Sequence, residues 1–265
     1  MRLVTIPFSH YNERARWALQ RFGVEFVERG YLPMFHFAGV LASAGLRGGR
    51  RDRTSSPLST PVLVTDDGER LRHSGLIVRY ASDRFSTPQT TLYPAEHLHP
   101  IEEIERRAHD RIGPHTRRIA YFHLLGEPAL MHELVRANVG AVQTLAFRVS
   151  RPLLAASLRR ALGVTAQRTA RSVQVLREEV AALDERLGDR PFLCGDRFTA
   201  ADLTVAALLS PVLRPPSYGT PMPPLERYPG PLRELVVQMR ATPTGAHCMR
   251  MYEQERRVVV TAARD

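Results

Sequence analysis

The chain has 265 residues, of which 43% are hydrophobic and 24% are charged, an ordinary globular mixture that excludes a disordered chain and allows one large or two smaller domains. It has no apolar run long enough to span a bilayer, no signal-peptide pattern and only two cysteines, so we expect a cytoplasmic protein without disulfides. The net charge of +10 comes from arginine, since the sequence contains no lysine. Because the arginines are interspersed with acids, as in "EEIERRAHDR", we expect solvated helix faces and no nucleic-acid partner.

Predicted strands and helices alternate in the first part of the chain. An apolar strand at 2–7 precedes helical spacing at 12–22, "VEFVERGYL" forms a second strand, and "FHFAGVLASAG" forms a weak helix. After a loop at 45–60, "VLVT" and "ERLRH" flank a hairpin turn, and a helix starts at Ser74. The order is therefore β-α-β-α-β-β-α and ends near Phe85. Within the loop, the basic run "RGGRRDR" at 47–53 predicts a local anion contact or simple solvation.

The remainder of the chain is predicted to be helical after a linker. Residues 87–100 contain three prolines and little periodicity, which is typical of a linker. Beyond them only "RRVVVTAAR", near the end, resembles a strand. Two helical stripes precede residue 146: Ile101, Ile104, Ala108, Ile112, Ile119 and Phe122, with a kink or break expected at Gly113–Pro114, and then Leu130, Leu134, Ala137, Ala141 and Leu145.

A long segment at 146–164 mixes arginine with leucine and predicts an extra helix. We expect this helix to pack on its neighbours or at a dimer interface, with a membrane surface as the weaker alternative. A further stripe at 173–187 repeats at three and four residues and predicts a strongly amphipathic helix.

The segment "RPFLCGDRFTAADLTVAALL" at 190–209 carries the most specific local signal. Thr199 is placed as an N-cap and Asp202 follows three residues later, the spacing of a capping box. The helix that follows is apolar nearly all round and is therefore predicted to be buried. Its first N–H groups must find partners, because each unsatisfied buried group costs about 1–3 kcal/mol.

Together these features resemble the cytosolic glutathione transferase superfamily, and within it the serine- and cysteine-type, bacterial-like members. The resemblance rests on "FSHYNERARWAL", "STPVL", "HSGLIVRY" and "FLCGDRFTAADL", in that order along the chain. It implies a thioredoxin-like domain at 1–86, a linker at 87–100 and an all-α helical bundle at 101–265. It also implies a homodimer. We expect no metal, because the histidines do not cluster with cysteines or acids at ligand spacing, and no membrane association.

The resemblance assigns roles to the residues at the first strand–helix junction. Taken alone, Ser9 or Asn12 reads as a helix cap. Aligned with the superfamily, Ser9 instead takes the position whose hydroxyl donates to the sulfur of glutathione and stabilises the thiolate. Tyr11 is the second candidate for this role, and His10 fits an exposed loop residue.

The resemblance also assigns the thiol-binding residues. Pro61 resembles the cis-proline that turns the backbone of Thr60 toward the thiol, and Ser74 resembles the serine that binds the γ-glutamyl carboxylate. At His73 the sequence departs from the pattern, because the superfamily usually has Glu or Gln there. The thiol is thus glutathione or another low-molecular-weight thiol, whose terminal carboxylate Arg47, Arg50, Arg51 or Arg53 could contact.

The implied activity is attack of the activated thiol on a small electrophile. Candidates for contact with this second substrate are Tyr11, Phe35, His115 and Tyr121. Two alternatives remain: a thiol-dependent isomerase or ether-cleaving enzyme of the same fold, and a non-catalytic interaction protein.

Overall fold

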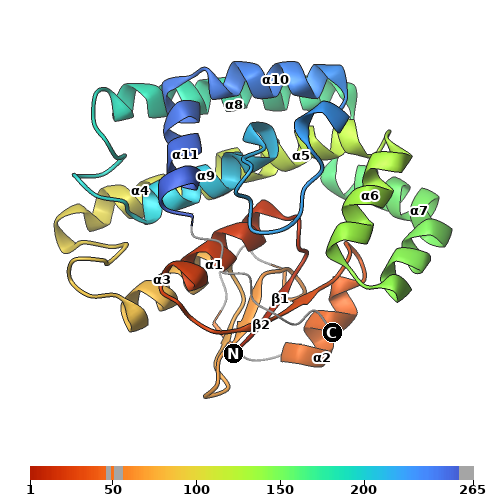
Figure 1. The fold of residues 1–265 in the computed structure, drawn as a ribbon, viewed down its shortest axis with the longest axis horizontal. Helices are drawn as coiled ribbons and strands as arrows, with labels where there is room; N and C mark the ends of the chain where they lie inside the picture. Colours follow the sequence, from red (N-terminus) through yellow and green to blue (C-terminus); the bar gives the residue numbers. More distant parts are fainter. Residues whose placement is uncertain (46–48, 51–55, 257–265) are drawn as a thin grey trace.

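The computed structural model describes residues 1–45, 49–50 and 56–256, and it confirms the predicted β-α-β-α-β-β-α order at the start of the chain (Figure 1). The elements are β1 (Arg2–Thr5), α1 (His10–Arg21), β2 (Val27–Gly30), α2 (His36–Ala44), β3 (Val62–Val64), β4 (Arg70–Leu71) and α3 (Ser74–Phe85). Arg50 forms an isolated bridge with Leu71, whereas Arg47, Arg51 and Arg53 lie outside the described residues.

The four strands form one mixed sheet in the order β2-β1-β3-β4. β1 pairs in parallel with β2 and antiparallel with β3, and β3 pairs antiparallel with β4. Side chains alternate across a strand, so Leu3 joins the large core that contains α1 and α3, while Val4 packs with Val40 and Ala44 of α2 on the opposite face. The sheet is thus covered on both faces by its own helices.

All remaining elements that the structure describes are helical. They are η1 (Ala95–His97), α4 (Leu98–Arg107), η2 (Ala108–Ile112), α5 (Gly113–Leu124), α6 (Pro128–Asn138), α7 (Ala141–Leu162), α8 (Ala166–Leu187), α9 (Ala200–Leu213), η3 (Leu225–Arg227), α10 (Gly230–Arg240) and α11 (Pro243–Gln254). Helix α4 begins at Leu98, inside the segment predicted as linker. The predicted strand "RRVVVTAAR" lies outside the described residues, apart from its first residue.

Helix α9 is the centre of the helical part, as its apolar sequence predicts. Nearly all of its residues are buried, and it contacts α1, α4, α5, α10 and α11. At its start Asp202 forms a capping box with Thr199: its Oδ2 accepts from the Thr199 N–H and hydroxyl, at 2.9 and 2.8 Å. The other carboxylate oxygen accepts from the Leu193 N–H at 2.9 Å and contacts His247 Nε2 at 3.0 Å. Asp202 therefore connects three segments of the helical part.

At the kink or break expected at Gly113–Pro114, the α-helical pattern is interrupted. The π-helical turn η2 stands between α4 and α5 and leads directly into α5. The Gly113 N–H bonds the carbonyl of Ala108, five residues earlier, and the next donor in that pattern is missing because Pro114 has no N–H. The change in helical pitch thus accommodates the proline and leaves the His109 carbonyl open to another donor.

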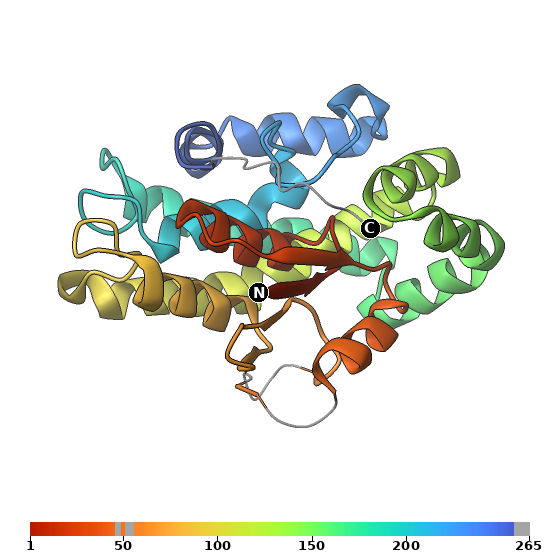
Figure 2. The same cartoon turned by 60° about the horizontal axis from the view of Figure 1, so that its bottom comes forward.

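The stripe predicted from Leu130 to Leu145 is divided between two helices, because the chain turns at Val139–Gly140. Figure 2 shows α6 and α7 packed together at one end of the molecule. Leu145 is 61% exposed and belongs to an apolar stripe on the outer side of α7, with Val142, Val149 and Leu153. Among the described helices, none is both long and apolar enough to cross a membrane.

Candidate functional site

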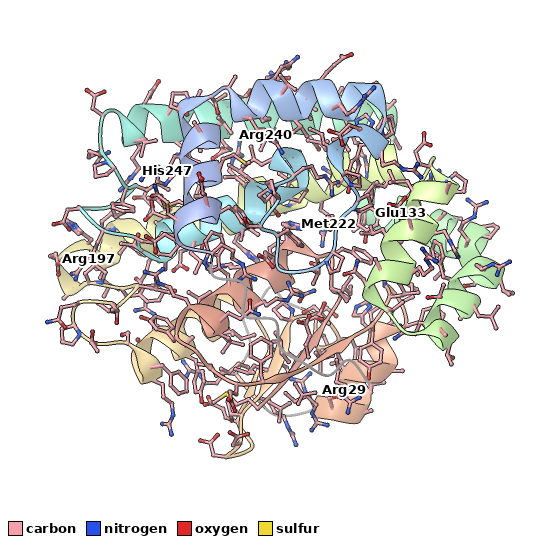
Figure 3. The ribbon with its side chains drawn as sticks, viewed as in Figure 1. Arg29, Glu133, Arg197, Met222, Arg240 and His247 are labelled. Atoms are coloured by element: carbon pink, nitrogen blue, oxygen red, sulfur yellow. The ribbon has the colours of Figure 1, made fainter. Side chains whose placement is uncertain are left out.

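A cavity of about 1870 Å³ lies between the sheet-containing part and the helical part. Its walls come from the α1 start, the residues after β2, the inner faces of α5, α6 and α7, and the segment that follows α9. Figure 3 shows the spread of this lining: Arg29 comes from strand β2 of the sheet, whereas Met222 and Arg240 lie in the helical part. A molecule bound there would contact both parts of the chain.

Ser9 lies on this cavity as the N-cap residue of α1. Its backbone has the extended geometry of an N-cap, and its carbonyl accepts from the N–H groups of Asn12 and Glu13 at 3.0 and 2.9 Å. Its side chain, however, makes no capping hydrogen bond. The hydroxyl therefore stays available to a ligand at the positive end of the helix dipole.

Tyr11 also lines the cavity, but its hydroxyl already has a partner. It donates to the His109 carbonyl, the group that Pro114 leaves open, at 3.2 Å. Burial raises the pKa of Tyr11 to about 12, so the phenol stays protonated at neutral pH. Gly113 makes room for it, because a Cβ there would lie 2.2 Å from the Tyr11 oxygen.

His10 does not occupy the exposed loop position that the sequence suggested. It is the first residue of α1, only 3% exposed, and its Nε2 lies 3.0 Å from the Gly113 carbonyl. Burial, followed by the charge of Arg117, lowers the pKa of His10 to about 3. A neutral imidazole that donates to a carbonyl is fixed in place, so His10 supports the junction between α1 and α5.

Thr60 reaches the same cavity from the start of the β3–β4 hairpin. The Thr60–Pro61 peptide is cis, as the sequence led us to expect. Asn12, which the sequence suggested only as a helix cap, donates from Nδ2 to Thr60 Oγ1 at 3.2 Å and to the Ile6 carbonyl at 2.9 Å. It links the first turn of α1 to the segment that carries Thr60.

His73 and Ser74 are not among the residues that line the cavity. His73 caps α3 with its own ring, because its Nδ1 accepts from the Gly75 N–H at 3.1 Å, and its ring lies edge-on to His109. Ser74 is buried, and its Oγ lies 3.5 Å from Nη1 of the equally buried Arg14. The resemblance assigned the start of α3 to the γ-glutamyl carboxylate. The His73 ring already takes one of the N–H groups there.

The four candidates for contact with a second substrate divide into two pairs. Tyr11 and Tyr121 line the cavity, whereas Phe35 and His115 do not. His115 points to the other side of α5, where its Nδ1 lies 2.9 Å from Ser172 Oγ. Helix periodicity places His115 and Tyr121 on different faces of α5. The face toward the cavity consists of Arg117, Ala120, Tyr121 and Leu124. Arg117 was not among the residues expected from the sequence, although its spacing of four from Tyr121 places both on one helix face.

Comparison with known proteins gives a match at the helical part. Residues 166–230 match the family profile of the glutathione S-transferase C-terminal domain. No curated protein sequence matches the chain.

Several solved structures share the fold over nearly the whole chain. The glutathione transferase GSTFuA3 from Phanerochaete chrysosporium has a TM-score of 0.62 and 15% identity, with 98% of each chain covered. The beta-etherase LigF from Sphingobium sp. strain SYK-6 has a TM-score of 0.57 and 16% identity over 94% of this chain and 98% of its own. A glutathione S-transferase domain-containing protein from Marinobacter aquaeolei VT8 has a TM-score of 0.55 and 21% identity, over 92% of this chain and 100% of its own.

The protein therefore has the glutathione S-transferase fold, in which a thioredoxin-like sheet is joined to an all-helical part. The resemblance to the glutathione transferase superfamily that the sequence motifs indicated is confirmed.

Proposed function

We propose that this protein binds glutathione or a related low-molecular-weight thiol and activates it for attack on a small electrophile in the cavity. The observation that carries this proposal is the Ser9 hydroxyl, which lies on the cavity at the start of α1 and is not used as a cap. The likeness in fold to glutathione transferases supports the same general activity.

In the proposed mechanism Ser9 donates a hydrogen bond to the thiol sulfur and favours its ionised form. A free thiol titrates near about 8.5, so a pKa lowered by about two units leaves it mostly ionised at neutral pH. The α1 dipole acts in the same direction. Tyr11 is less suited to this task, because its hydroxyl already donates to the His109 carbonyl.

Thr60 is proposed to bind the thiol through its backbone, opposite Ser9, with Pro61 setting the direction of the chain. His73 and Ser74 are proposed to bind the head group at the start of α3. Because the His73 ring already accepts from the Gly75 N–H, the helix start offers fewer free donors to a γ-glutamyl carboxylate. This arrangement favours a shorter or differently charged head group as the alternative to glutathione.

Calorimetric titration of glutathione and of cysteinylglycine, which lacks the γ-glutamyl group, tests the proposal. Ser9→Ala is expected to keep the affinity for the thiol but to raise the pKa of the bound sulfur by about one unit or more, the effect of one lost charge-assisted hydrogen bond. Ultraviolet absorbance of the thiolate as a function of pH gives that pKa. Ser74→Ala is expected to lower the affinity for glutathione more than the affinity for cysteinylglycine.

The matched control is Ser157→Ala, a serine on α7 that does not line the cavity. It should leave both affinity and thiol pKa unchanged. Absence of binding by both thiols at millimolar concentration, with the protein folded, contradicts a thiol-dependent function and leaves a non-catalytic role for the fold.

The proposal includes a two-fold homodimer in the cytoplasm, with C₂ symmetry as the commonest arrangement for such assemblies. The mass of the purified protein by light scattering tests it, and a monomer at micromolar concentration contradicts it.

A further inference from the structure

Arg117 and the arginine beside it on α5 differ in how the protein holds them. Arg118 donates from Nε to the Leu162 carbonyl at 3.1 Å and from Nη1 to Ser172 Oγ at 2.8 Å. Among the described residues, by contrast, no hydrogen bond or ion pair holds the guanidinium of Arg117, which lines the cavity. Its guanidinium carbon lies 5.9 Å from the centroid of the Tyr11 ring.

The groups around Arg117 do not neutralise it. His10 is uncharged at neutral pH because its pKa is about 3, and the pKa of Tyr121, raised by burial, is about 12. Tyr121 follows Arg117 by one helical turn on the same face of α5, and both residues line the cavity. The site thus offers a cation and a neutral donor, and no carboxylate among the described residues forms an ion pair with Arg117; Asp110 lies near the Tyr11 ring.

The charged residues in the rest of the cavity lining are also mainly positive. Besides Arg117 the lining includes five arginines and two glutamates, and one of these glutamates, Glu28, is paired with Arg16. Arg214, at the end of α9, has buried Nε and Nη2 atoms without hydrogen-bond partners in the described part of the chain, while its Nη1 donates to the Tyr228 hydroxyl. A guanidinium stays charged in proteins, so both Arg117 and Arg214 favour an anion in the cavity.

We propose that the electrophile is a carboxylic acid, and that Arg117 and Tyr121 bind its carboxylate while the rest of the molecule extends toward Ser9. A planar guanidinium binds carboxylates in a bidentate manner, and such charge-assisted bonds are stronger in a partly water-excluded site. This inference rests on the proposed function only in calling the ligand an electrophile. The anion site itself requires no thiol.

The test compares cinnamate with cinnamamide, which has the same shape and conjugated double bond but no charge, by calorimetry in the absence of thiol. Cinnamate is expected to bind about 10-fold or more tightly than the amide, as one charged hydrogen-bonded pair implies. Arg117→Gln is expected to remove this preference and to leave cinnamamide binding unchanged. Arg117→Lys keeps the charge without the bidentate geometry and should give an intermediate affinity.

Arg106→Gln is the control, since it makes the same change in net charge at an exposed position of α4 outside the cavity lining. It should leave the preference for cinnamate intact. Equal binding of acid and amide by the unmodified protein, equal losses of both in Arg117→Gln, or no binding of either at millimolar concentration would each overturn the proposal. Because thiol binding is measured separately, failure of this site is distinguishable from failure of the thiol site.

Discussion

Polar residues around the α1 junction divide into those that hold the structure and those that remain available to ligands. His10, Asn12 and Tyr11 all have partners in the α5 region, the β1 end or the β3 start. Ser9 and Arg117 face the cavity without such partners among the described residues. Preorganisation of this kind fixes the walls of a site while leaving its reactive groups free.

His10 makes stability depend on pH in a direction that can be worked out. Its pKa is about 3 in the folded protein and about 6.5 in the unfolded chain, so between these values only the unfolded state binds the proton. Folding stability attributable to His10 is therefore complete above pH 6.5 and falls as the pH drops toward 3. Between pH 7 and 5 the loss is about 2 kcal/mol.

Urea unfolding of the unmodified protein and of His10→Gln at both pH values measures this loss. The variant lacks the titrating group and should lose about 2 kcal/mol less than the parent on going from pH 7 to 5. The carboxylates and other histidines titrate in both proteins and cancel in the comparison. The same pH dependence in both proteins would show that His10 is not the group responsible.

At the scale of elements, the η2–α5 junction accepts hydrogen bonds from two residues of the α1 start, His10 and Tyr11. Pro114 cannot donate, the helix widens to a π turn, and the Tyr11 hydroxyl takes the carbonyl of His109. Gly113 is needed at this point because Tyr11 occupies the space of a side chain.

Gly113→Ala is expected to destabilise the protein by about 1–3 kcal/mol, because the added methyl group forces Tyr11 out of its position. Thermal unfolding measures the effect. Gly126→Ala is the matched control, since a Cβ at Gly126 meets nothing within 4 Å. Equal changes in Tm for the two variants would contradict the close approach of Tyr11.

Over the whole molecule, the end of the described chain is tied to α1 by a buried ion pair. Arg256 Nε lies 2.8 Å from Glu13 Oε1, and both side chains are fully buried. Glu13 also pairs with Arg16 at 2.7 Å and accepts from the Gly219 N–H at 3.1 Å. These partners hold the pKa of the Glu13 carboxyl below its usual value despite burial.

Removing one partner of a buried pair leaves a buried charge, so Arg256→Met is expected to cost about 3–5 kcal/mol in the free energy of unfolding. The exposed pair Arg227–Glu133 supplies the control, and Arg227→Met is expected to cost less than about 1 kcal/mol. Chemical denaturation of both variants gives the comparison. A small loss for Arg256→Met would show that water or another cation replaces the guanidinium.

Local pattern was enough to predict the fold class. The cis-proline at position 61 was expected from the superfamily resemblance. The order of strands and helices, the hairpin turn and the buried helix with Thr199 and Asp202 all follow from short stretches of sequence. These features depend on hydrogen bonding and periodicity within a few residues, which is why they could be identified without coordinates. Local pattern missed the turn at Gly140, where a stripe of apolar residues continues across two helices, and the π turn η2 that precedes Gly113–Pro114.

The tertiary structure alone decided which side chains meet. His10 is buried because α5, about a hundred residues away in sequence, packs over it. A local sequence pattern cannot predict a contact between segments so far apart. Arg117 and Ser9 face one cavity, while His73 turns its ring onto its own helix start. The sequence by itself determined the order of strands and helices in the first part, the capping box of α9 and the superfamily resemblance, since these depend on short stretches of neighbouring residues. Which polar groups are left without partners depends on contacts between distant segments, and only the folded chain determines them.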